Sequence, residues 1–168
     1  MKALKQGLLI YFMGFLSFMG CKPANEKKAM EKEEKQLIDL CLTFAKRADA
    51  LEKRAFENGE YRLKQFVPDF NTLFAQYADG TMNRTISGLN FRNPPRYHDI
   101  NTAIRTKVAP LSETRYQVIF EGVQKWRSIR FTIDKRQSEW KLLHFETYVG
   151  IANHGTHKGE EIWSKHKL

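Results

Sequence analysis

The chain has only two cysteines among its 168 residues, Cys21 and Cys41. With so few thiols it cannot rely on a disulfide framework, so its stability must come from a hydrophobic core. It also lacks an apolar run of about 20 residues, the length that a helix needs to span a bilayer. The longest such run, residues 7–18, has twelve residues. What remains after it is enough for one core-stabilised domain.

The chain also lacks the short motifs of several common enzyme classes, including the P-loop, G-x-G-x-x-G, C-x-x-C and G-x-S-x-G. One cluster of metal-ligating residue types lies near the end, where His154 and His157 precede Glu160 and Glu161. Gly155 disfavours the helix that would bring both imidazoles to one side. We therefore assign no catalytic, cofactor-binding or metal-binding residues, and we expect no enzyme activity.

The first 20 residues have the layout of an export leader, with Lys2 and Lys5 ahead of the apolar run. The small residue Gly20 is followed directly by Cys21, an arrangement that resembles a bacterial lipobox. The resemblance implies that residues 1–20 are a lipoprotein signal peptide and that Cys21 carries the lipid, including palmitate. An ordinary cleaved leader with a chance cysteine is the alternative.

Residues 21–36 are expected to form a charged tether, because residues 22–36 hold nine charges and almost no apolar side chain. Lys22 follows the cysteine, where many lipoproteins retained at an inner membrane have Asp. We therefore predict a lipid-anchored protein of the bacterial envelope, on the periplasmic face of the outer membrane.

The body of the domain, residues 37–150, begins with helix-like patterns and continues with strand-like ones. Residues 37–55 repeat apolar side chains at steps of three and four, and Cys41 lies on that stripe as a small buried hydrophobe. Pro68 suits the first turn of a second helix, which carries Phe70, Leu73, Phe74 and Tyr77. Five segments rich in β-branched and aromatic residues follow: 85–91, 102–108, 116–121, 126–134 and 140–148.

Helices followed by a run of strands predict an α+β fold in which N-terminal helices pack on a curved antiparallel sheet. Residues 151–168 show no clear period and are expected to form a C-terminal tail. One late helical turn of that tail would carry Ile162 and Trp163.

Two short stretches resemble a known family. Phe91 followed by Pro94, Pro95, Arg96 and Tyr97 looks like an F-x-x-P-P-x-Y step into a sheet. Residues 131–133, a polar turn and residues 140–142 look like a closing hairpin. Together with the order of elements, they resemble the nuclear transport factor two-like cone, and within it the immunity proteins of Rhs-type polymorphic toxin systems.

The resemblance implies a protein that binds and neutralises a cognate toxin domain. The formal net charge is +9, or +7 without the leader, because residues 1–20 hold two of the 28 basic residues and none of the 19 acidic ones. A basic surface favours an anionic partner, here a toxin with an acidic surface. The lipid anchor adds a membrane contact, nucleic acid is not expected as a partner, and self-association as a homodimer stays open.

Strand alternation along 140–148 separates two candidate surfaces. If Trp140 and Leu142 face the core, His144 and Glu146 point into the mouth of the cone, near Tyr77. Those three residues define the alternative function, a cone that binds a small ligand or catalyses acid–base chemistry. The same alternation turns other side chains outward as a partner-binding surface: Arg105, Lys107, Ile119, Arg130, Leu143 and Phe145.

Overall fold

The computed structural model describes residues 24–57, 65–78 and 94–167. The chain divides into two compact units, residues 1–33 and residues 34–168. All packing described below lies within the second unit. No helix of the described residues is long and apolar enough to cross a membrane. The expected lipid site Cys21 and the expected strand 85–91 lie outside the described residues.

Two α-helices precede the sheet along the chain. Helix α1 spans Ala24–Glu57, and six of its buried side chains lie on the predicted stripe: Leu37, Cys41, Phe44, Ala48, Leu51 and Ala55. Helix α2 spans Val67–Tyr77 and has a proline in its first turn, where the missing N–H costs no hydrogen bond. Cys41 is fully buried, and burial raises the pKa of its thiol well above the usual value. Its predicted role as a small hydrophobe is confirmed.

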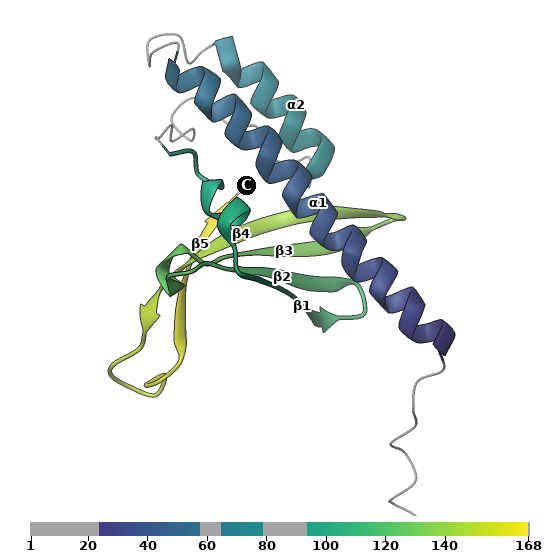
Figure 1. Ribbon diagram of the computed structural model, residues 1–168, viewed down its shortest axis with the longest axis vertical. Coiled ribbons are helices and arrows are strands. Elements are labelled where there is room, and N and C mark those ends of the chain that lie inside the picture. The colour runs from purple at the N-terminus through teal and green to yellow at the C-terminus, as the bar shows by residue number, and fades with distance from the viewer. Residues whose placement is uncertain (1–23, 58–64, 79–93, 168) are drawn as a thin grey trace, which may run out of the picture. The chain divides into compact units, whose positions relative to one another are not determined.

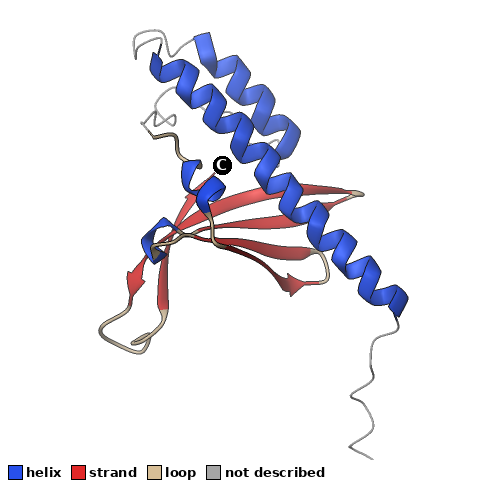
Figure 2. Ribbon diagram, in the orientation of Figure 1, coloured by secondary structure: helices blue, strands red, loops and turns tan. Residues whose placement is uncertain are grey.

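Five strands form an antiparallel sheet in the order β1-β2-β3-β4-β5. Their bounds are Arg105–Ser112, Arg115–Glu121, Ile129–Arg136, Glu139–Ile151 and Glu161–Lys167. Short 3-10 helices, His98–Thr102 (η3) and Lys125–Arg127 (η4), precede β1 and β3. Helices α1 and α2 pack against this sheet, so the α+β prediction is confirmed (Figures 1 and 2).

The expected helical turn around Ile162 and Trp163 is wrong, because both residues belong to strand β5. Tyr148 of β4 pairs with Trp163, and Gly150 pairs with Ile162. Strand β5 has the sequence EIWSKHK, which does not alternate polar and apolar residues, so its own residues do not indicate a strand. Trp126, expected at the start of a strand, lies in η4, and β3 begins at Ile129.

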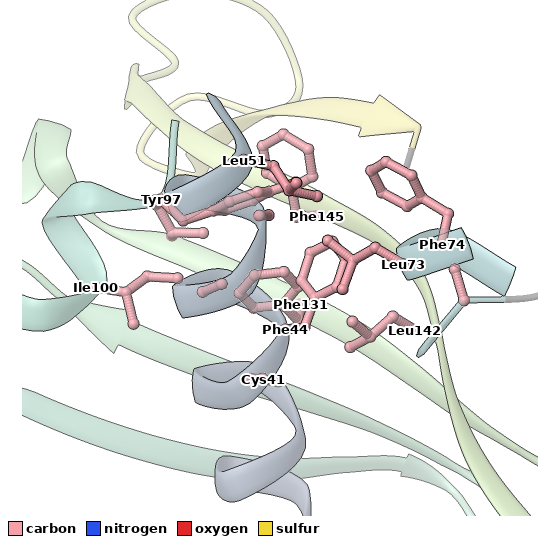
Figure 3. Packing of buried hydrophobic residues seen from close by; sticks show 14 of the residues in the cluster. Cys41, Phe44, Leu51, Leu73, Phe74, Tyr97, Ile100, Phe131, Leu142 and Phe145 are labelled. Atoms are coloured by element: carbon pink, nitrogen blue, oxygen red, sulfur yellow. The ribbon is translucent and has the colours of Figure 1, made fainter. Parts of the chain in front are cut away.

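Aromatic rings fill the space between α1 and the sheet (Figure 3). The ring of Phe44 on α1 lies 5.4 Å from Tyr97 and 6.2 Å from Phe131 of β3, measured between centroids. The Tyr97 ring in turn lies 5.1 Å from Phe145 of β4 in an edge-to-face contact. Such pairs contribute about 0.5–1.5 kcal/mol each beyond the burial of their area. Tyr97 therefore joins the helix to two strands.

Tyr97 is held in place by α1 through the backbone. Pro94 and Pro95 have no N–H, so the first donors after them are the amides of Arg96 and Tyr97. The Arg96 amide donates to Glu52 Oε2 at 2.7 Å, and the Tyr97 amide donates to Asp49 Oδ1 at 2.8 Å. Asp49 and Glu52 are three residues apart on α1 and thus share one side of the helix. Residues 94–97 are thus fixed by two carboxylates of α1, a helix that lies far from them in the sequence.

We expect Glu52→Ala to lower the free energy of unfolding by about 1–3 kcal/mol, because the Arg96 amide loses its acceptor in a part-buried position. Urea denaturation followed by circular dichroism measures the change. The matched control is Glu57→Ala on the same helix, where the carboxylate is exposed and lies 3.9 Å from Lys53. The control should change stability by under about 0.5 kcal/mol. Equal effects for the two variants would contradict the anchoring role of Glu52.

Candidate functional site

Strand β4 contains a β-bulge that changes which side chains face the core. Thr132 of β3 pairs with His144, while the next residue, Ile133, pairs with Leu142. Leu143 is thus an extra residue in β4, and strand alternation is reset there. Leu142 and Phe145 both face the core, and His144 and Glu146 point to the opposite side of the sheet.

The opposite side is the candidate site, here called the charged face. It is the face of the sheet turned away from the hydrophobic core. One cross-strand row runs Lys107, Ile119, Arg130, Glu146 and Lys165, one residue from each strand. Including neighbouring rows, the charged side chains of this face are seven basic and five acidic: Arg105, Lys107, Arg115, Arg130, Arg136, Lys141, Lys165, Glu121, Asp134, Glu139, Glu146 and Glu161.

Arg130 is the centre of this row. Its Nε donates to Glu146 Oε2 at 2.6 Å, and its guanidinium carbon lies 4.3 Å from the centre of the Trp163 ring. Such stacking of a cation on an indole is an attractive contact that also orients the guanidinium. Trp163 and Arg130 are both half-buried, so this pair presents a rigid aromatic and cationic surface.

The remaining acids of the charged face are also engaged by cations. Asp134 is 4% exposed and lies 3.4 Å from Arg115 and 3.2 Å from Arg136, measured from its Oδ2 to a guanidinium nitrogen. Lys107 pairs with Glu121. Each acid is thus neutralised locally, and the excess of basic side chains gives the face its net positive charge.

Four of the six expected partner-binding residues lie on this face: Arg105, Lys107, Ile119 and Arg130. Phe145 does not. It is 1% exposed, and its ring contacts Tyr97 and stacks on His166 at 4.9 Å. Leu143 is half-buried at the bulge. The expectation that Phe145 faces outward was wrong because it assumed unbroken alternation from Trp140.

The cavity-mouth alternative also depended on that alternation. Trp140 packs against the core, as expected, but His144 and Glu146 lie on the other side of the sheet from it. Tyr77 is on the helical side, where its ring lies 6.0 Å from Phe44 and its hydroxyl accepts a hydrogen bond from Arg47. The structure therefore does not bring Tyr77 together with His144 and Glu146.

Two surface hollows lie beside α1, and neither is lined by Tyr77, His144 or Glu146. One, of about 470 Å³, separates α1 from residues 94–101, with Phe56, Pro94 and Pro95 in its wall. The other, of about 420 Å³, lies between α1 and α2. Among the described residues, no group of three or more histidine, cysteine or acidic side chains is placed to hold a metal ion.

His144 lies beside the ion pair, with its Nε2 3.9 Å from Glu146 Oε2. Burial lowers the pKa of His144 below its ordinary value of 6.5, and the positive charge of Lys165 acts in the same direction. Glu146 acts in the opposite direction with a smaller effect. The imidazole is therefore neutral at pH 7 in the folded protein.

The folded state binds the His144 proton less tightly than the unfolded state does. This histidine therefore stabilises the folded protein above pH 6.5, and the stabilisation is lost as the pH falls below that value. We expect the free energy of unfolding to decrease from pH 7 to lower pH, and His144→Gln to remove part of that slope. Urea denaturation at a series of pH values measures it. His154→Gln, a change at an exposed histidine, is the control. An unchanged slope in His144→Gln would contradict this role.

Residues missed from the sequence include Trp163 and Lys165 on β5, and Glu121, Arg115, Asp134 and Arg136 within the expected sheet. Residues 161–167 show no alternation of polar and apolar side chains, so no sequence pattern marks β5. No sequence pattern marks the bulge either. A comparison of the chain with family models, curated proteins and solved structures finds no match. The likeness to the cone-fold immunity proteins thus stays a prediction from the sequence.

Proposed function

We propose that this protein is an envelope-anchored lipoprotein that binds and neutralises a cognate Rhs-type toxin domain, and that the charged face is its binding surface. The observation that carries the proposal is the Arg130–Trp163 stack at the centre of a face with seven basic and five acidic side chains. Trp and Arg are the residue types most often found as energetic anchors of protein interfaces. The excess positive charge complements an acidic partner.

The packing of the helices on the sheet supports the nuclear transport factor two-like cone as the fold behind this function. The aromatic core favours the binding role over the ligand-binding alternative, because side chains such as Phe44 and Phe131 fill the space between α1 and the sheet. Among the described residues, the space between α1 and the sheet is filled in this way and leaves no room for a small molecule. Neutralisation by binding also requires no catalytic residue.

The test is calorimetric titration of the protein with the toxin domain encoded next to it. We expect Arg105→Glu with Lys165→Glu to weaken binding about tenfold or more, because both side chains are exposed and lie on the two edge strands of the charged face. The loss should shrink at high salt, where charge steering is screened.

The matched control is Lys46→Glu with Lys53→Glu, which reverses two exposed charges on α1 instead. It changes the net charge equally and should leave binding close to that of the unmodified protein. Equal affinities for the two double variants, both folded by circular dichroism, would remove the charged face as the binding surface. No binding by the unmodified protein would contradict the immunity function itself.

Cys21→Ser tests the anchor separately. We expect this variant to remain an unlipidated precursor, since lipid attachment needs the thiol, while its domain folds as before. The first buried side chain of the core is Leu37, well after the anchor. Metabolic labelling with radioactive palmitate and circular dichroism measure the two properties. Label in the serine variant would show that the lipid is attached elsewhere.

A further inference from the structure

One end of the sheet exposes large apolar side chains on neighbouring turns. Ile104, directly before β1, is 68% exposed, and Val123 and Trp126, between β2 and β3, are 72% and 59% exposed. These three residues are here called the apolar tip. Other side chains extend the same end along the β4–β5 hairpin: Val149, Ile151 and Ile162. Leu111, 53% exposed, lies at the opposite end, next to the β1–β2 turn.

The turn that carries Val123 and Trp126 is tightly built. The amide of Gly122 donates to Ser128 Oγ at 3.2 Å, and the amide of Arg127 donates to the Gln124 carbonyl at 2.8 Å. A Cβ added at Gly122 would come within 2.7 Å of the Arg127 Cβ, so only glycine fits there. The amide of Ile104 donates to the Glu121 carbonyl at 2.9 Å, which joins the two turns of the apolar tip.

Cations surround the apolar tip. The two segments that form it, residues 99–107 and 121–130, contain five basic and two acidic residues. The Arg127 guanidinium lies 4.8 Å from the centre of the Trp126 ring and 3.8 Å from Asp99. Lys125 pairs with Glu161 and lies 5.4 Å from the centre of the Tyr148 ring. These contacts hold Arg127 and Lys125 beside the apolar side chains of the tip.

We propose that the apolar tip inserts into the interfacial region of an anionic bilayer. An exposed tryptophan beside aliphatic side chains, with lysine and arginine around them, is the composition of membrane-interface segments. The basic excess complements anionic headgroups. The anchor of a protein interface instead lies within a patch whose neighbours exclude water, whereas these residues stand on separate turns.

This inference goes beyond the proposed function, which assigns the charged face to the toxin and the membrane contact to the lipid on Cys21 alone. A lipid on a tether holds a domain near the bilayer but does not orient it. Insertion of the apolar tip would set the strands upright on the membrane and leave the charged face open to a partner arriving from the side.

The experiment uses the full-length protein, extracted from membranes and reconstituted into vesicles of phosphatidylethanolamine and phosphatidylglycerol with brominated acyl chains. Bromine quenches a tryptophan only when the ring enters the bilayer. We expect quenching of the unmodified protein, its loss in Trp126→Phe, and its retention in Trp140→Phe, whose ring lies at the other end of the sheet. Replacing phosphatidylglycerol with phosphatidylcholine should weaken the quenching.

Two charged variants separate insertion from mere proximity. Val123→Asp should remove most of the quenching of Trp126, because a carboxylate resists entry into the bilayer and is repelled by anionic lipids. Leu111→Asp adds the same charge at an equally apolar site on the opposite end and should leave quenching unchanged.

Absence of quenching in the unmodified protein, or equal effects of the two variants, would overturn the proposal. So would concentration-dependent cross-linking that Val123→Asp abolishes, which would assign the tip to a second copy. Membrane insertion is measured by quenching and toxin binding by titration, so a failure of the immunity function would not change the quenching results.

Discussion

Two carboxylates on α1 join this helix to the segment that leads into the sheet. Asp49 and Glu52 accept the amides of Tyr97 and Arg96, and these bonds place the Tyr97 ring among Phe44, Phe131 and Phe145. The prolines before Arg96 supply no donors of their own, so the turn has few local ways to satisfy its backbone. Helix α1 supplies the missing partners, and in doing so it sets where the chain enters the sheet.

A single extra residue in β4, Leu143, decides which side chains lie on the charged face. If Leu143 were a regularly paired residue of β4, alternation from Leu142 would bury His144 and Glu146 and expose Phe145. The bulge reverses this assignment, so that Phe145 completes the aromatic core and Glu146 becomes the partner of Arg130. The core and the charged face are therefore two results of one irregularity, and a change at that position would disturb both.

Period and composition were enough to predict the helices and most of the strands. The stripe of α1 from Leu37 to Ala55 was predicted because each turn of a helix that packs on a sheet must bury apolar side chains. Strand β5 was not predicted, because its stability comes from pairing with β4 and not from its own residues. The ion pairs of the charged face depend on register between strands, which no single segment encodes. Trp163 and Lys165 could be placed beside Arg130 and Glu146 only once the strands were aligned.

The sheet is open, so strands β1 and β5 each have an edge, and edges are where foreign strands add and aggregation begins. Strand β1 contains Pro110, which has no N–H to offer to an incoming strand, and the bulge at Leu111 follows it directly. A regular ladder cannot grow past such a pair of irregularities. Backbone pairing at the β1 edge is thus limited to the residues before Pro110, which leaves an incoming strand too short a template for a stable ladder.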